Sequence, residues 1–190
     1  MATYTMKAFY LGTFADMDVN ESDFTAELAS NMAGKTFGSG TDPLYNRINS
    51  LTTNDADNDG TVRHNSGGQT GETLTYNGVA SIYDSLSPYN ATLTYNDGTT
   101  ASAVVILMQD ELGRVFFAPY VDGSTSNVPL SAKPIQSVAI VSAIASSNYG
   151  NYAKQASNVF LDGLVSGTSA DDVMGTSYTD QDGTKMNAYG

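Results

Sequence analysis

Two turn signals in the middle of the chain determine much of its structure. Asn77-Gly78 and Asn96-Asp97-Gly98 each lie between runs that are rich in Thr, Tyr, Val and Ile. Asn-Gly and Asp-Gly pairs favour the tight turns that join antiparallel strands, because these residues tolerate positive φ angles. We therefore predict two β-hairpins, which join 73–76 to 79–83 and 89–95 to 99–108.

Further strands are expected on both sides of these hairpins, at 3–11, 48–53, 114–118 and 135–144. The apolar run 103–108 lacks alternation, which is typical of a central strand covered on both faces. Short strands separated by turns favour a mainly β fold, either an antiparallel β-sandwich or an open barrel.

One short helix is predicted within 21–33. Phe24, Leu28 and Met32 recur every four residues, so they would form one apolar stripe on a helix. Gly34 follows at the position where glycine commonly ends helices. We expect the stripe to pack against the sheet.

The sequence divides into two parts. Residues 1–148 are expected to form the β-sandwich-like domain with its single helix. Residues 149–190 form a polar tail, which is Gly-rich and acidic from 163 onward. Such a segment buries little apolar surface, so we expect it to need a ligand or a neighbour to become ordered.

The charge of the chain narrows the classes of partner. Its formal net charge is -12, from 20 acidic and 8 basic residues. So few cations cannot neutralise a run of phosphates, and no nucleic-acid partner is expected.

The apolar runs are too short for a membrane span, so none is predicted. We expect an extracellular or cell-surface protein, or a virion component.

The most specific motif is Asp55-Ala56-Asp57-Asn58-Asp59-Gly60-Thr61. Carboxylates at alternate positions, followed by glycine and then a backbone carbonyl, match the first half of an EF-hand-type loop. Three neighbouring carboxylates repel one another unless a cation lies among them. The sequence therefore predicts a Ca²⁺ site formed by Asp55, Asp57, Asp59 and Thr61.

The loop departs from the full calcium pattern. Ser66 stands where the complete loop has a bidentate glutamate, and Gly67 and Gly68 make a following helix improbable. Glu72 offers a more distant ligand. An alternative therefore stays open, in which the aspartates form a hydrogen-bonded turn without a metal.

A second candidate calcium site lies in the tail. Residues 167–175 resemble one degenerate RTX nonapeptide turn, in which carbonyl and aspartate oxygens hold calcium between stacked turns. The candidate ligands are Asp171, Asp172, Asp180 and Asp182. One such turn cannot build a β-roll by itself.

A set of short segments along the chain shares one further likeness; they are 3–11, 35–38, 42–46, 53–60, 89–92, 109–110, 116–119 and 167–168. Together they resemble the amino-terminal region of secreted bacterial proteins that carry RTX-like repeats and a Hint autoprocessing domain. No part of the chain matches the Hint domain itself. The resemblance implies a secreted or surface role and calcium dependence.

Catalytic residues are not expected. His64 is the only histidine and the chain has no cysteine, which disfavours zinc and most nucleophilic triads. We expect His64 to be an exposed loop residue. The four glutamates, Glu21, Glu27, Glu72 and Glu111, each have a simpler use at a helix or a turn.

Two classes of function fit these features. The first is a non-enzymatic, calcium-stabilised structural or adhesive module that self-associates, as a subunit of a surface fibre or virion appendage. The alternative is a module that binds a surface glycan or receptor. Its candidate stacking residues are Tyr83, Tyr89, Tyr95, Tyr120, Tyr149 and Tyr152.

Overall fold

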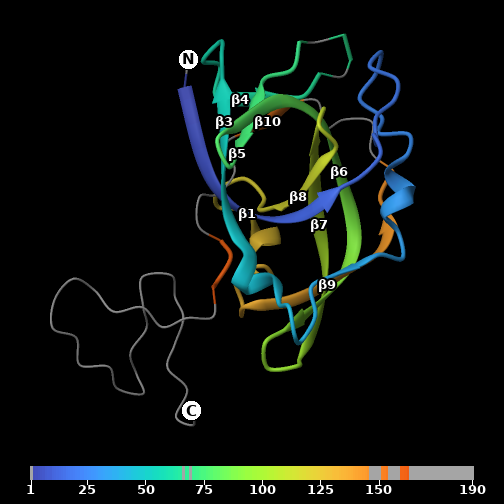
Figure 1. The fold of residues 1–190 in the computed structure, drawn as a ribbon, viewed down its shortest axis with the longest axis vertical. Coiled ribbons are helices and arrows are strands. Elements are labelled where there is room, and N and C mark those ends of the chain that lie inside the picture. Colours follow the sequence, from blue (N-terminus) through green and yellow to red (C-terminus); the bar gives the residue numbers. More distant parts are fainter. Residues whose placement is uncertain (1, 66, 69, 146–150, 154–158, 163–190) are drawn as a thin grey trace, which may run out of the picture.

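The computed structural model describes residues 2–65, 67–68, 70–145, 151–153 and 159–162. Its fold is mainly β, with one antiparallel sheet of eight strands and a small two-stranded sheet (Figure 1). The large sheet contains β1 (Ala2–Thr13), β2 (Thr36–Phe37), β3 (Ile48–Asp55), β5 (Thr73–Tyr76), β6 (Val79–Tyr95), β7 (Thr100–Asp110), β8 (Arg114–Ala118) and β9 (Ile135–Ala143). The small sheet pairs β4 (Thr61–Arg63) with β10 (Asn151–Ala153).

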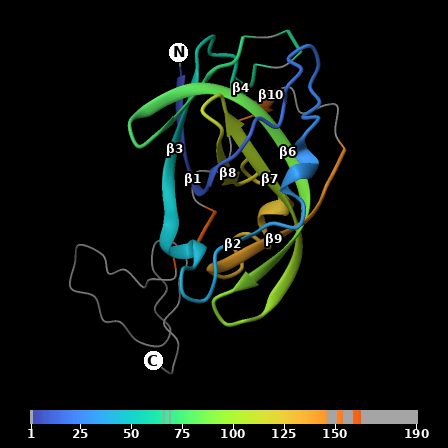
Figure 2. The same ribbon diagram turned by 45° about the vertical axis from the view of Figure 1, so that its right-hand side comes forward.

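The large sheet closes on itself. Strand neighbours run in the order β6-β5-β3-β1-β8-β7, and β7 pairs again with β6. These pairings form a barrel-like ring, which surrounds the centre of Figures 1 and 2. The predicted mainly β antiparallel fold is confirmed.

Beyond the ring, the β6–β7 hairpin continues as an arm. β9 pairs with the second half of β6, from Tyr89 to Tyr95, and β2 pairs with β9. The arm therefore has the strand order β2-β9-β6-β7. We call this four-stranded part the hairpin arm; it lies at the lower end of the molecule in Figure 1.

The turn signals act as predicted. Asn77 and Gly78 have φ angles of 49° and 77°, as the tight turn between β5 and β6 requires. The runs 79–83 and 89–95, predicted as two strands, are parts of the single strand β6. The register of β6 against β7 shifts between Tyr83 and Ser85, so Asp84 lies in a β-bulge.

Two apolar clusters fill the interior on opposite faces of β7 and β8. Met108 and Phe116 belong to one cluster, whereas Leu107 and Phe117 belong to the other. All five residues of β8 are buried. The prediction that the apolar run 103–108 belongs to a strand covered on both faces is therefore confirmed for residues 105–108, whereas Val104 is exposed.

The helix predicted within 21–33 is wrong. This segment forms turns and a single 3-10 turn, η1 (Ala29–Met32); the other 3-10 turns are η2 (Leu44–Arg47) and η3 (Thr125–Asn127). Side chains of Asn20 and Asp23 accept hydrogen bonds from backbone amides two residues later, which favours turns over helix. The carbonyls of Glu21 and Asp23 accept bonds from Gly68 and Gly67 instead of from a following helical turn.

The folded unit extends past the predicted boundary at residue 148. Val159 and Phe160 are buried, and the Phe160 ring lies 4.3 Å from the Phe9 ring and 5.1 Å from the Phe117 ring, centroid to centroid. β10 pairs with β4. Parts of the predicted tail therefore belong to the core and to the small sheet.

None of the helical segments in the described part of the chain is long and apolar enough to cross a membrane.

Candidate functional site

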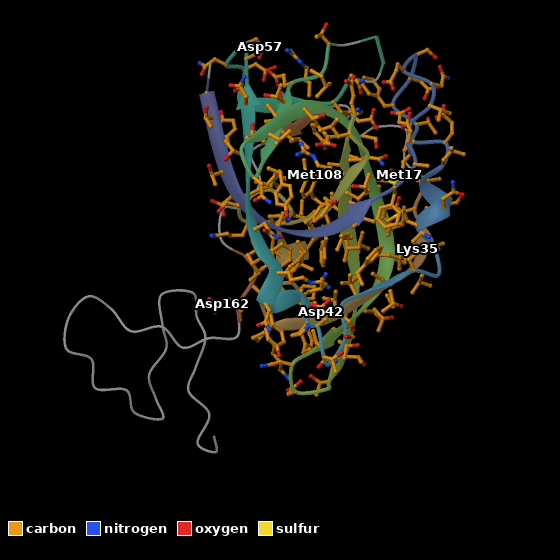
Figure 3. All side chains as sticks on the ribbon, in the orientation of Figure 1. Met17, Lys35, Asp42, Asp57, Met108 and Asp162 are labelled. Carbon is orange, nitrogen blue, oxygen red and sulfur yellow. The ribbon has the colours of Figure 1, made fainter. Side chains whose placement is uncertain are left out.

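The predicted calcium loop connects β3 to β4 at the upper end of the molecule, where Figure 3 labels Asp57. One carboxylate oxygen from each of Asp55, Asp57 and Asp59 can be chosen so that all lie within 4.8 Å of one another. Asp55 is buried at the end of β3, whereas Asp57 and Asp59 are exposed. The structure therefore brings together the three carboxylates that the sequence singled out.

Hydrogen bonds from the loop and from Tyr4 on β1 already occupy the Asp55 carboxylate. Its Oδ1 accepts from the amides of Asn58 (2.5 Å) and Asp59 (3.2 Å). Its Oδ2 accepts from the Gly60 amide (3.0 Å) and the Tyr4 hydroxyl (3.2 Å). A carboxylate has about four acceptor sites, so these donors use its whole capacity.

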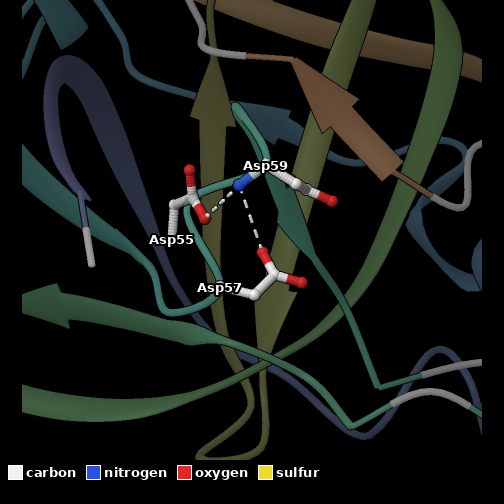
Figure 4. A group of neighbouring side chains, drawn as sticks. All are labelled: Asp55, Asp57 and Asp59. Carbon is white, nitrogen blue, oxygen red and sulfur yellow. Dashed lines mark hydrogen bonds between the residues drawn. The ribbon is translucent and has the colours of Figure 1, made fainter.

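These bonds also set the ionisation of Asp55. Burial raises the pKa of this carboxyl. The hydrogen bonds from the Gly60 and Asn58 amides and from the Tyr4 hydroxyl together lower the pKa by more than burial raises it, so the pKa lies below its usual range. Figure 4 shows the Asp59 amide between the carboxylates of Asp55 and Asp57, to which it donates. Asp55 is thus held as an anion by the amides of its own loop and by Tyr4 of β1.

Arg63 supplies positive charge to the outer side of the loop. Its guanidinium forms an ion pair with Asp57 and lies 3.9 Å from an Asp59 oxygen and 3.8 Å from a Glu72 oxygen. The pKa of Arg63 is raised, first by its hydrogen bond to Asp57. Arg63 therefore already neutralises part of the charge for which the sequence predicted a metal.

Glu72 and Thr61 support the loop from its two ends. The buried Glu72 accepts hydrogen bonds from the amides of Ala56 and Arg63, so it fastens both sides of the β3–β4 connection. Thr61 donates its amide (2.8 Å) and its hydroxyl (2.7 Å) to Asp59. Glu72 comes near the loop, as the sequence suggested, but its oxygens are engaged with backbone amides.

The other predicted ligands, Asp171, Asp172, Asp180 and Asp182, lie outside the described residues.

An acidic pocket that sequence reasoning missed lies beside the ring. Its volume is about 540 Å³, and five carboxylates line it: Asp16, Glu21, Asp84, Asp110 and Glu111. No lysine or arginine occurs among its described lining residues. Asp110 is bound by Arg114 at 2.6 Å, and Glu111 accepts from the Asn65 amide group at 3.0 Å.

The pocket raises the pKa of two carboxyls. The pKa of Asp84 rises to about 8, first because burial disfavours its charge and then because Asp16, Glu21 and Asp18 are nearby. The pKa of Glu21 rises to about 7 for the same reasons, with Asp18 and Asp16 as the main charges. These two groups can therefore hold protons near neutral pH, a property common at functional sites.

Long-range structure brings the pocket residues together. The β-bulge at Asp84 adds one residue to β6, and bulges commonly redirect a side chain. Buried Gln109 holds the 14–17 segment: it accepts from the Met17 amide at 2.8 Å and donates to the carbonyls of Phe14 and Ala15. Neither the bulge nor this bridge has a local sequence signal. Glu21 and Glu111 therefore line the pocket, beyond the simple roles predicted for them.

Several other residues also differ from expectation. His64 is buried, not exposed. The centroid of its ring lies 5.7 Å from that of Phe24 and 5.6 Å from that of Tyr83, so His64 packs with these two rings in the interior. Tyr83, Tyr89 and Tyr95 are buried, which removes them as stacking surfaces for a sugar. Tyr120 is half-buried against the core. Tyr149 and the side chain of Tyr152 lie outside the described part of the chain.

Comparisons of the chain with protein-family models, with curated proteins and with solved structures found no match. The likeness to secreted bacterial proteins with RTX-like repeats therefore stays a prediction, carried by the short segments given above.

Proposed function

We propose that this protein is a non-enzymatic structural or adhesive module that works outside the cell and is stabilised by calcium. The observation that carries the proposal is the Asp loop, where oxygens of Asp55, Asp57 and Asp59 lie within 4.8 Å of one another. Calcium prefers several oxygen ligands, with carboxylates prominent among them. The acidic net charge of -12 supports a site for a divalent cation.

In this proposal, calcium competes with Arg63. The exposed carboxylates of Asp57 and Asp59 would bind the ion first, because the Asp55 oxygens already accept hydrogen bonds from the amides of the loop and from the Tyr4 hydroxyl of β1. The Arg63 guanidinium is then displaced from Asp57. The apparent affinity for calcium therefore depends on how much more strongly Asp57 and Asp59 bind calcium than they bind the Arg63 guanidinium. We expect this affinity to be modest.

Calcium at this loop would stabilise more than the loop itself. The loop joins β3, a strand of the ring, to β4, and β4 pairs with β10. An ion that fixes the β3–β4 connection would therefore also fix β4, the strand with which β10 pairs. In this proposal calcium has a structural role, and the module is a subunit of a surface fibre or a virion appendage.

Thermal unfolding with calcium and with EDTA tests the proposal. A ligand that binds only the folded state at 100 times its dissociation constant stabilises by about 2.7 kcal/mol. We expect calcium to raise the melting temperature of the wild type and not of the Asp57→Asn/Asp59→Asn variant. Asp122→Asn, which changes an exposed carboxyl in a different turn, is the matched control.

The Arg63→Gln variant sharpens the same experiment. Loss of the competing guanidinium is expected to increase calcium affinity, measured by isothermal titration calorimetry, even where the variant is less stable without the ion. Identical melting curves with calcium and EDTA for wild type and Arg63→Gln would refute the calcium part of the proposal.

A further inference from the structure

The hairpin arm has two outer edges, and the chain covers one of them. The Gly34 amide donates to the Ile140 carbonyl, and the Ile140 amide donates to the Lys35 carbonyl, both at 2.8 Å. Gly38 continues along the same edge and passes so close to the Gln136 carbonyl that any side chain would collide with it. The β9 edge is therefore closed by the segment 34–38.

The opposite edge, on the first half of β7, has no such cover. β8 pairs only with Ile106 to Gln109, which leaves 100–105 paired with β6 alone. Because the Tyr95 amide donates to the Thr99 carbonyl, alternation directs the main-chain groups of Thr100, Ser102 and Val104 away from β6. Among the described residues, none forms a hydrogen bond with these outward-facing groups.

The chemistry of this edge permits another strand to add. Proteins usually protect an open edge with lysine, proline, a bulge or a very short strand. The whole run 98–109 contains no charged residue and no proline. Thr100, Ser102 and Val104 are exposed, and Val104 retains 38% of its accessible surface. Main-chain bonds to such an edge are a common mode of recognition.

The arm is also locally neutral in a strongly acidic chain. At its tip, Asp97 forms an ion pair with Lys133 at 2.6 Å, and this partner holds the pKa of Asp97 below its usual range. Two copies with a net charge of -12 each repel one another over most of their surfaces. The neutral β7 edge is a place where they can meet without that cost.

We propose that the β7 edge pairs with the β7 edge of a second copy of this chain. Antiparallel pairing about a two-fold axis at Ser102 places Ser102 opposite its own copy and Thr100 opposite Val104. An edge with itself as partner is complementary in hydrogen bonding by symmetry. The two hairpin arms then form one continuous sheet.

This inference deepens the structural role proposed above, but it does not depend on calcium. The Asp loop lies at the upper end of the molecule and the hairpin arm at the lower end (Figures 1 and 3). Loss of the calcium effect would leave the pairing intact, and a monomeric protein would leave the calcium effect intact. The two proposals can therefore fail separately.

Sedimentation velocity on the full chain over a range of concentrations tests the pairing. We expect a concentration-dependent dimer for the wild type and at least a tenfold weaker association for Ser102→Pro. Proline removes an outward-facing amide that makes no bond to β6, so the strand itself keeps its ladder. Ser102→Ala is the matched control: it keeps the amide and is expected to keep the dimer.

A second pair of measurements covers a Ser102→Pro variant that fails to fold. Val104→Lys places charge next to the axis and is expected to weaken the dimer while circular dichroism stays unchanged. Amide hydrogen exchange of Thr100, Ser102 and Val104 is expected to slow as concentration rises. A wild type that is monomeric throughout, a dimer that both variants leave unchanged, or protection of these amides in the monomer by the chain itself would overturn the proposal.

Discussion

Replacement of Asp84 by asparagine is expected to change how stability depends on pH. The pKa of the Asp84 carboxyl is raised from 3.8 to about 8 by burial and by the carboxylates of Asp16, Glu21 and Asp18. The folded state therefore binds a proton that the unfolded state releases above pH 4. The stability linked to this proton is complete below pH 4 and is lost as pH rises to about 8.

The size of the effect follows from the shift. One pKa unit corresponds to about 1.4 kcal/mol, so an isolated group whose pKa rises from 3.8 to about 8 would lose about 6 kcal/mol once it is fully ionised. The pocket is open to solvent, and the charge of Glu21, whose own pKa is raised, contributes to the raised pKa of Asp84, so these two carboxyls titrate as a pair. We therefore expect Asp84→Asn to exceed the stability of the wild type by about 2 kcal/mol at pH 8 and to match it below pH 4.

Urea unfolding at several pH values between 3.5 and 8.5 measures this difference. The introduced amide is nearly isosteric with the protonated carboxyl of Asp84, so packing changes little. Asp122→Asn, in an exposed turn away from the pocket, is the control and should keep the wild-type pH profile. If Asp84→Asn keeps the wild-type decline between pH 5 and 8, or is less stable at pH 8, the reasoning about the pocket is refuted.

Two further variants test the long-range packing. Phe160→Ala is expected to lower the free energy of unfolding by about 3 kcal/mol, because the ring fills a site between Phe9 and Phe117; no loss in urea unfolding would mean that Phe160 is outside the core. Gln109→Leu keeps a similar volume but leaves the Met17 amide without its acceptor, so we expect a loss of about 2 kcal/mol. A thermal midpoint like that of the wild type would contradict this role.

Local turn chemistry made most strands predictable. Asn77 and Gly78 adopt the positive φ angles that the hairpin needs, and the strand predicted at 114–118 has these bounds in the structure. Both features depend on residues next to one another in the chain. The closure of the sheet does not, because β1 pairs with β3 and with β8 far along the sequence.

The predicted helix at 21–33 is also absent because of contacts between residues far apart in the sequence. The stripe of Phe24, Leu28 and Met32 satisfies helical periodicity, yet only Met32 is fully buried. Phe24 packs on His64 instead, and Leu28 is partly exposed. Tertiary bonds from the 67–68 loop to carbonyls near residue 21 outweigh a weak local preference.

The candidate sites divide in a similar way. The Asp loop is local, so its spacing correctly placed Asp55, Asp57 and Asp59 together. The competing cation, Arg63, lies only a few residues later in the sequence. Its ion pair with Asp57 could not be predicted from the spacing, because it depends on the path of β4, which places Arg63 beside the loop. The acidic pocket needs segments around residues 16, 84 and 111 to converge, and no spacing within one segment indicates that.

The length of β6 gives the molecule a mechanical direction. This one strand pairs with β5 near its start, with β7 along most of its length and with β9 near its end. Tension along its axis shears all three ladders at once, whereas a pull across the axis opens a single ladder one bond after another. A subunit stretched parallel to β6 would therefore resist rupture far better than one peeled from the side.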